Sequence, residues 1–315
     1  MITISVEVCG DDWVNKETVK QLLYNSNHKD PIVLDLHAEG PSLHAVGAVG
    51  TLLEYLQQFD RSPGSVYVNN WSNAIEQVPF NRLNRHELSH FFWMSDRYAN
   101  HVPDHRTLQF LFGYFVGRRT VPRCTMLMDI QQHYSKHFLL SLMNTVTEFK
   151  NSDLDPVSEW TDPTQFAQWL STPAVSSLDN HTIRDQFSQA HNTNASLLKW
   201  YSTFDIELVA ETYTHGDTFF VTEKTVRPIV AGKSMLVYGP KNYLARLQEL
   251  GFQTWGDVWD ESYDQLIGPQ RWQAMRSVID KLLSPDQEQL HKQCLPIVMH
   301  NQQHAQALIK KYKPQ

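Results

Sequence analysis

Short apolar stretches alternate with longer segments of helical periodicity along the first third of the chain. The strand-like stretches are residues 2–8, 31–37 and 65–70, and the segments between them, residues 13–24 and 45–59, repeat apolar positions every three to four residues. Strands that alternate with amphipathic helices form βαβ units. The pattern therefore predicts an α/β fold with a mostly parallel sheet.

The same alternation restarts near Pro103. Residues 107–117 predict a strand whose aromatic run, FGYF, is buried, and residues 124–134 predict a helix. Polar stretches rich in Ser, Asp, Asn and Thr follow and predict loops around short helices. Alternation of strand and helix resumes at Asp205. We therefore expect a second α/β region after the first.

Helical spacing dominates the end of the chain, over residues 263–283 and 285–312, and predicts two closing helices. The domain organisation that follows is an N-terminal acceptor-side α/β domain over residues 1–103, a C-terminal nucleotide-sugar-binding α/β domain over residues 104–284, and closing helices over residues 285–315.

Composition limits the class of protein. The chain has 315 residues, of which 41% are hydrophobic, as in globular proteins, and its net charge of -7 argues against broad affinity for nucleic-acid phosphates. Three widely spaced cysteines predict neither a disulfide framework nor a cysteine zinc site. The N-terminus lacks the features of a signal peptide, and no apolar run approaches the roughly 20 residues that span a bilayer. We expect a cytoplasmic protein without a membrane span.

The most informative motif is Thr222-Glu223-Lys224, which lies between a strand-like segment and a helix-like one. Thr222 is suited to cap the helix, and the carboxylate of Glu223 favours the positive helix end. The same residues suit a nucleotide diphosphate-sugar, because a carboxylate binds ribose hydroxyls and a cation binds the pyrophosphate. The motif therefore predicts both a helix start and a donor site.

Residues 222–239, TEKTVRPIVAGKSMLVYG, resemble the donor-binding signature of the α-1,3-fucosyltransferase family. They look closer still to related glycosyltransferase-like proteins of phages and large viruses, in which Leu-Gly-Phe-x-Thr and Asp-Glu-Ser-Tyr-Asp segments follow. Here those segments are residues 250–254 and 260–264. The match covers about sixty residues with several separate anchors, which is more specific than a lone glycine pattern.

The resemblance implies the GT-B arrangement, in which two Rossmann-like domains face a cleft and the C-terminal one holds the donor. It implies an inverting transfer without a cofactor or an obligatory metal, to a glycan, a protein, a small molecule or a modified DNA base, in the host cytoplasm if the chain is viral. On this basis Glu223 contacts the ribose, Arg123 and Lys224 contact the pyrophosphate, and Arg227 supports them. Glu211 matches the family's Glu-Asn-Ser-type loop, although its spacing to Glu223 is longer than in typical members.

The catalytic base should come from the N-terminal domain, because open α/β sheets place ligands beyond the carboxyl ends of their strands. Glu39 follows such a strand and precedes Gly40 and Pro41, so we predict that it takes the acceptor's proton. Asp35 and His37 are the alternatives.

Two other motifs suggest metal chemistry. Residues 86–90, HELSH, match the His-Glu-x-x-His pattern of zinc peptidases, but the metzincin spacing lacks its third ligand, and we interpret the segment as an amphipathic helix. Asp153 and Asp155 form an Asp-x-Asp pair without a preceding apolar strand, which favours a turn. We expect no metal site. The alternatives to a glycosyltransferase are a zinc peptidase and a non-catalytic nucleotide-sugar-binding protein.

Overall fold

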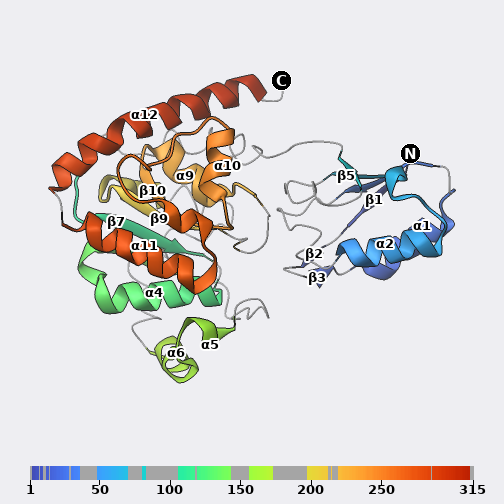
Figure 1. Ribbon diagram of the computed structural model, residues 1–315, viewed down its shortest axis with the longest axis horizontal. Coiled ribbons are helices and arrows are strands. Elements are labelled where there is room, and N and C mark those ends of the chain that lie inside the picture. Colours follow the sequence, from blue (N-terminus) through green and yellow to red (C-terminus); the bar gives the residue numbers. More distant parts are fainter. Residues whose placement is uncertain are drawn as a thin grey trace. The chain divides into compact units, whose positions relative to one another are not determined.

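The computed structural model forms two compact units, shown in Figure 1. The first contains Met1–Ser89 and Gly216–Val221, and the second contains His90–His215 and Thr222–Gln315. The structure describes residues 2–6, 8–9, 12–13, 15–27, 30–35, 48–69, 80–82, 106–117, 119–142, 156–172, 197–211, 214, 219–284 and 286–312. The expected domain boundary near Pro103 lies outside these residues.

A four-stranded sheet in the order β1-β4-β5-β6 is the centre of the first unit, and all its neighbouring strands are parallel. Its strands are β1 Ile2–Ser5, β4 Ile32–Asp35, β5 Val66–Asn69 and β6 Asn81–Arg82. A short antiparallel pair, β2 Val8–Cys9 and β3 Asp12–Trp13, follows β1. The parallel pairing confirms the βαβ prediction for this part of the chain.

Two amphipathic helices complete the first unit, α1 Lys16–Asn25 and α2 Ala48–Gln58. Leu23 from α1 and Leu52 from α2 are buried in one apolar cluster with Ile4, Leu34 and Val68 from the three longer strands. Side chains on alternate strand positions point to the same face of a sheet. The apolar residues of the predicted strands and those of the predicted helices therefore pack into a single core.

The second unit is built on another parallel sheet, in the order β10-β9-β7-β8. Its strands are β7 Phe112–Val116, β8 Phe138–Leu142, β9 Ile206–Ala210 and β10 Ser234–Tyr238. Every residue of β9 and β10 is buried, as expected for parallel strands that helices cover on both faces. The aromatic run in β7 is largely buried, which confirms the prediction for that segment.

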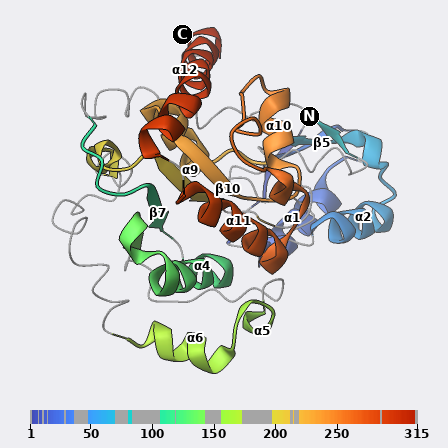
Figure 2. The same ribbon diagram turned by 60° about the vertical axis from the view of Figure 1, so that its left-hand side comes forward.

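Helices lie on both faces of this sheet (Figures 1 and 2). One layer contains α9 Glu223–Ala231, which packs on β9 and β10, and α12 Gln287–Tyr312, which packs on α9. The other contains α4 Val121–His133 and α11 Gly268–Leu282. The shorter helices are α5 Val157–Trp160, α6 Pro163–Leu170 and α10 Tyr243–Glu249. The second unit is thus a three-layer α/β structure.

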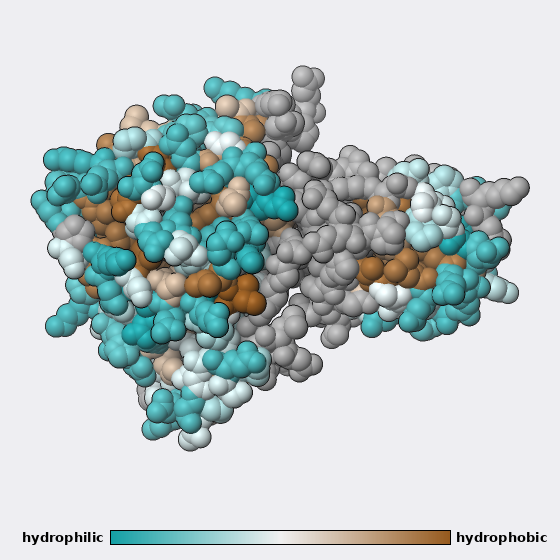
Figure 3. All heavy atoms as spheres, in the orientation of Figure 1, coloured by the Kyte–Doolittle hydropathy of each residue, from teal (hydrophilic) through white to brown (hydrophobic). Residues whose placement is uncertain are grey.

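The surface of the second unit that faces the viewer in Figure 3 is mostly hydrophilic, with smaller hydrophobic patches. Among the described residues of the second unit, the exposed large apolar side chains are Leu108, Ile267, Leu295 and Met299. None of the described helices is long and apolar enough to cross a bilayer.

The predicted closing helices are present as α11 and α12. Helix α12 continues through Pro296, whose ring removes one backbone donor from the helix interior. Pro296 is exposed, so water can satisfy the carbonyl that loses this donor. Both helices belong to the second compact unit.

Asp264 and Arg271 anchor the segments that follow β10. The Arg271 guanidinium is fully buried, and it donates to the carbonyls of Val237 and Pro240, each at 3.0 Å, and to Asp264 Oδ1 at 2.9 Å. The Asp264 carboxylate also accepts from the backbone N–H of Leu244, with both oxygens at 3.1 Å, and so caps α10. The conformation after the strand therefore depends on a residue of the DESYD segment.

Replacing Asp264 by Ala leaves the Arg271 guanidinium buried without its carboxylate and uncaps α10. We expect the free energy of unfolding to fall by about 3–5 kcal/mol, as measured by urea titration with circular dichroism. Glu249→Ala is the matched control, because the Arg246–Glu249 pair is exposed, and its loss should cost less than about 1 kcal/mol. Equal losses in the two variants would contradict the anchoring role.

Candidate functional site

Several of the predicted donor residues, Glu211, Thr222, Glu223 and Lys224, lie together beyond the carboxyl end of β9. Ala210 is the last residue of β9 and pairs in register with Tyr238, the last residue of β10. The backbone N–H of Glu211 extends this pairing by donating to the Tyr238 carbonyl at 2.9 Å. The first turn of α9 begins at Glu223. Carboxyl ends of parallel strands next to a helix N-terminus are where open α/β sheets bind ligands.

Thr222 is the N-cap of α9, which confirms the prediction from the sequence. Its backbone is extended, at φ -91° and ψ 179°, and its hydroxyl accepts from the Lys224 N–H at 3.2 Å. At the other end of the helix, Gly232 has a φ of 68°, in the left-handed region that glycine adopts at helix C-termini. The sequence therefore sets both limits of α9.

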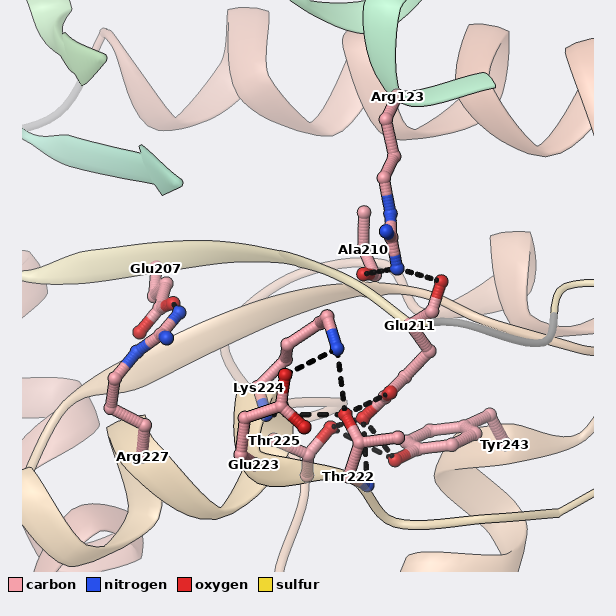
Figure 4. Close-up of polar contacts among 10 residues, drawn as sticks. All are labelled: Arg123, Glu207, Ala210, Glu211, Thr222, Glu223, Lys224, Thr225, Arg227 and Tyr243. Atoms are coloured by element: carbon pink, nitrogen blue, oxygen red, sulfur yellow. Dashed lines mark hydrogen bonds and ion pairs between the residues drawn. The ribbon is translucent and has the colours of Figure 1, made fainter. Parts of the chain in front are cut away.

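Glu223 and Lys224 form an ion pair at the start of α9 (Figure 4). Lys224 Nζ lies 2.5 Å from Glu223 Oε1 and 3.4 Å from the hydroxyl of Thr222. The side chains are 22% and 15% exposed, respectively, so both are largely shielded and still reachable from solvent. The structure thus brings together the predicted ribose and pyrophosphate ligands.

Glu211 is buried behind this pair and accepts hydrogen bonds from α9 and α10 (Figure 4). Oε2 accepts from the Thr222 hydroxyl at 2.5 Å, and Oε1 accepts from the Thr222 N–H at 3.3 Å. Oε1 also accepts from the Thr225 hydroxyl at 2.6 Å and from the Tyr243 hydroxyl at 2.9 Å. Burial raises the pKa of Tyr243 well above its ordinary value, and the Glu211 charge raises it further, so its hydroxyl remains a donor. Sequence reasoning missed Thr225 and Tyr243, although Thr225 belongs to the TEKT segment.

Arg123 lies in the first turn of α4, and its guanidinium is buried. Nη2 donates to the carbonyls of Ala210 at 3.0 Å and Glu211 at 2.8 Å (Figure 4). These bonds attach α4 to the end of β9, where a backbone carbonyl needs a donor. The structure therefore gives Arg123 a contact with the site's backbone, and its contact with donor phosphates stays a prediction.

Arg227 is buried on α9 and forms an ion pair with Glu207 of β9. It also donates to the hydroxyl of Tyr201, which in turn donates to Glu207. The pKa of Glu207 is raised, because burial raises it and the charge of Arg227 offsets only part of this effect. Burial alone lowers the pKa of Arg227, but Glu207 outweighs this effect and raises it. The guanidinium thus has a carboxylate partner within the protein, and its support of the pyrophosphate stays a prediction.

The predicted base and its alternatives belong to the first unit. Glu39 and His37 lie outside the described residues, whereas Asp35 is the last residue of β4 and is partly buried. The HELSH segment, Asp153 and Asp155 also lie outside the described residues. Within the part of the chain that the structure describes, no group of His, Cys, Asp and Glu side chains is arranged to hold a metal ion.

Two tryptophans of the second unit are packed in its interior. Trp255 and Trp259 are 0% and 6% exposed, and their rings stack with centroids 5.6 Å apart and planes at 5°. Tyr201 is also fully buried. These residues contribute to the core of the second unit.

Comparisons with known proteins give little further support. No protein-family model matches the chain, and no curated protein sequence matches it. A solved structure, an α,α-trehalose-phosphate synthase (UDP-forming) from Burkholderia vietnamiensis, matches with a TM-score of 0.39 and 10% sequence identity, over 90% of this chain. The match spans 65% of the length of that synthase. A likeness this distant carries no argument about function, so the site rests on its own geometry.

Removing the Arg227 charge tests whether this charge stabilises the Glu207 carboxylate. Arg227→Met leaves the Glu207 carboxylate buried without its cation, and we expect the free energy of unfolding to fall by about 3–5 kcal/mol in urea titrations. Adding Glu207→Gln should recover much of this loss, because the double variant has removed both charges and leaves no unpaired buried charge. Failure of the double variant to recover stability would show that Glu207 is not the partner that matters.

Proposed function

We propose that the chain is a nucleotide-sugar-dependent glycosyltransferase whose donor binds at the start of α9. The observation that carries this proposal is the adjacency of the Glu223 carboxylate and the Lys224 ammonium beyond the carboxyl ends of β9 and β10. In this proposal Glu223 accepts from ribose hydroxyls, and Lys224 binds the pyrophosphate beside the positive end of the helix.

The ion pair suits a ligand that offers both kinds of partner. In the structure the Glu223 carboxylate and the Lys224 ammonium neutralise each other. A nucleotide-sugar brings hydroxyl donors for Glu223 and phosphate acceptors for Lys224, so each charged group exchanges one partner for another. A bare phosphate lacks the ribose hydroxyls and brings negative charge next to the Glu223 carboxylate. The geometry thus favours a ligand with a sugar next to a diphosphate.

The proposed reaction displaces a nucleoside diphosphate from the sugar. An acceptor hydroxyl oxygen forms a bond to the anomeric carbon as the bond from that carbon to the phosphate oxygen breaks. The electron pair moves to the leaving diphosphate, where the Lys224 ammonium and the α9 dipole stabilise the added charge without a metal. Attack from the opposite face inverts the anomeric carbon. The acceptor's proton moves to a base, for which Glu39 remains our candidate.

A glycan, a protein, a small molecule and a modified DNA base all carry a suitable hydroxyl, and each remains a candidate. The resemblance to α-1,3-fucosyltransferases suggests fucose as one sugar to test, with GDP as its carrier.

The first test is binding of nucleotides to the purified chain. GDP-, UDP- and ADP-linked sugars should raise the melting temperature, and a CMP-linked sugar, which has a single phosphate, should raise it less. For the sugar that protects most, Lys224→Met should raise Kd about 10- to 100-fold by calorimetry, because a charge-assisted hydrogen bond contributes about 1.5–3 kcal/mol.

Lys292→Met is the matched control, because Lys292 is 71% exposed on α12 and, within the part of the chain that the structure describes, its ion pair with Glu288 is long, at 3.9 Å. The Kd of the Lys292→Met variant for the same nucleotide-sugar should equal that of the unmodified chain. Absence of binding by every nucleotide-sugar, or equal losses in the two lysine variants, would refute the proposed donor site. Tight binding without transfer to any acceptor class would instead identify a non-catalytic nucleotide-sugar-binding protein.

Glu39→Gln tests the base separately from the donor site. An amide cannot take the acceptor's proton, so we expect transfer to fall by about 100-fold or more while Kd for the donor stays unchanged. Sugar transfer is measured by mass spectrometry of the acceptor. Asp35→Asn and His37→Gln are the parallel variants, since Asp35 and His37 are the alternative bases. An active Glu39→Gln protein would remove Glu39 from the mechanism.

A further inference from the structure

The residue Glu211 is held from several sides at the edge of the donor site. Its backbone N–H donates to Tyr238 of β10, and its carbonyl accepts from Arg123 of α4. Its carboxylate accepts from Thr222, at the start of α9, and from Tyr243, on α10. One buried residue therefore connects the sheet to each of the helices around the site.

The Glu211 carboxylate also determines how the Thr222 hydroxyl caps α9. A threonine hydroxyl has one proton and two acceptor lone pairs. Because the Thr222 hydroxyl donates its proton to Glu211 Oε2, it presents only lone pairs to the start of α9. Those lone pairs accept from the Lys224 N–H at 3.2 Å and lie 3.4 Å from Lys224 Nζ. The position of Lys224 thus depends on Glu211 through one hydroxyl.

The remaining oxygen of Glu211 repeats this arrangement with two more hydroxyls. Thr225 and Tyr243 both donate to Oε1, and their own oxygens are 2.9 Å apart. Thr225 lies in the first turn of α9 and is fully buried, and Tyr243 begins α10. Hydroxyl donors are directional, so these bonds fix the orientation of the turn as well as its distance from β9.

Glu207 provides a contrast on the same strand. It is also buried, but its partners include the cation of Arg227, which neutralises its charge. Glu211 instead receives uncharged hydroxyl and amide donors from the residues that flank Glu223 and Lys224. The second arrangement suits positioning of a neighbouring group more than neutralisation of a charge.

We propose that Glu211 is a positioning residue of the donor site, which does not touch the nucleotide-sugar but holds Lys224 in place through the Thr222 hydroxyl. This inference rests on the proposed function of the site. Misplacement of a binding group by about 1 Å is enough to lower activity severely in enzymes. A displaced Lys224 would therefore bind the ligand more weakly.

Donor affinity in a double-mutant cycle tests the route. The nucleoside diphosphate, GDP, UDP or ADP, that binds the unmodified chain most tightly is titrated into Glu211→Gln, Thr222→Val and the double variant. An amide nitrogen cannot accept the hydroxyl proton, so we expect Glu211→Gln and Thr222→Val each to raise Kd about tenfold. The double variant should match either single one, because both changes break the same route. Thr222→Ser keeps the hydroxyl and should restore affinity.

Additive losses in the double variant would overturn the inference, since Glu211 would then act on the ligand independently of Thr222. Unchanged affinity in Glu211→Gln would also overturn it. Glu207→Gln removes another buried carboxylate of β9 and also leaves the Arg227 guanidinium without its carboxylate, so it is the more disruptive control. An equal rise in Kd there would reduce Glu211 to a general structural role.

Hydrogen exchange provides a second readout that needs no ligand. In the empty protein, Glu211→Gln should speed amide exchange in peptides that cover Thr222 and Lys224, and peptides from β10 should exchange as before. Unchanged exchange at the start of α9 would overturn the inference. If the unmodified chain binds no nucleotide, the proposed function fails, and the exchange measurement still decides whether Glu211 holds the helix.

Discussion

A carboxylate that is removed from water must receive hydrogen bonds or a positive charge, and this requirement organises the second unit. Its carboxylates meet the requirement in different ways. Glu207 pairs with Arg227 inside the structure, and Asp264 pairs with Arg271 while it caps α10. Glu211 receives hydroxyl and amide donors from the helices around it. Each solution fixes a connection between a strand and a helix that follows it, and Glu211 and Asp264 do so at the carboxyl edge of the sheet.

Local sequence was sufficient to predict most of the elements and the start of α9. The strands and helices depend on apolar periodicity, which is a property of a few neighbouring residues, and α9 begins where the pattern placed it. The strand-like segment that precedes Thr222 was predicted wrongly, because residues 219–221 are buried but form no strand. The cap is equally local, because Thr222 reaches an N–H only two residues away. The parallel pairing was also predictable, because neighbouring strands of one sheet that are joined by a crossover helix run parallel.

The partners of the two buried arginines were not predictable in the same way. In the sequence, Arg123 and Arg227 are both cations near a proposed phosphate site. In the structure, Arg123 donates to carbonyls 87 and 88 residues away, and Arg227 pairs with a carboxylate 20 residues away. Such contacts depend on how β9 packs against α4 and α9, which no short motif encodes. Tyr243 reaches Glu211 across 32 residues for the same reason.

The Glu223–Lys224 pair joins consecutive residues, which is unusual for an ion pair on a helix. Neighbouring residues on a helix point about 100° apart, and favourable pairs are spaced three or four residues apart. The Lys224 side chain must therefore turn back to reach Glu223, at a cost in side-chain entropy and with little gain in helix stability. A pair of this kind opens easily when better partners arrive. Its position, where Glu211 and Thr222 hold the backbone in place, agrees with the proposed exchange of partners with a ligand.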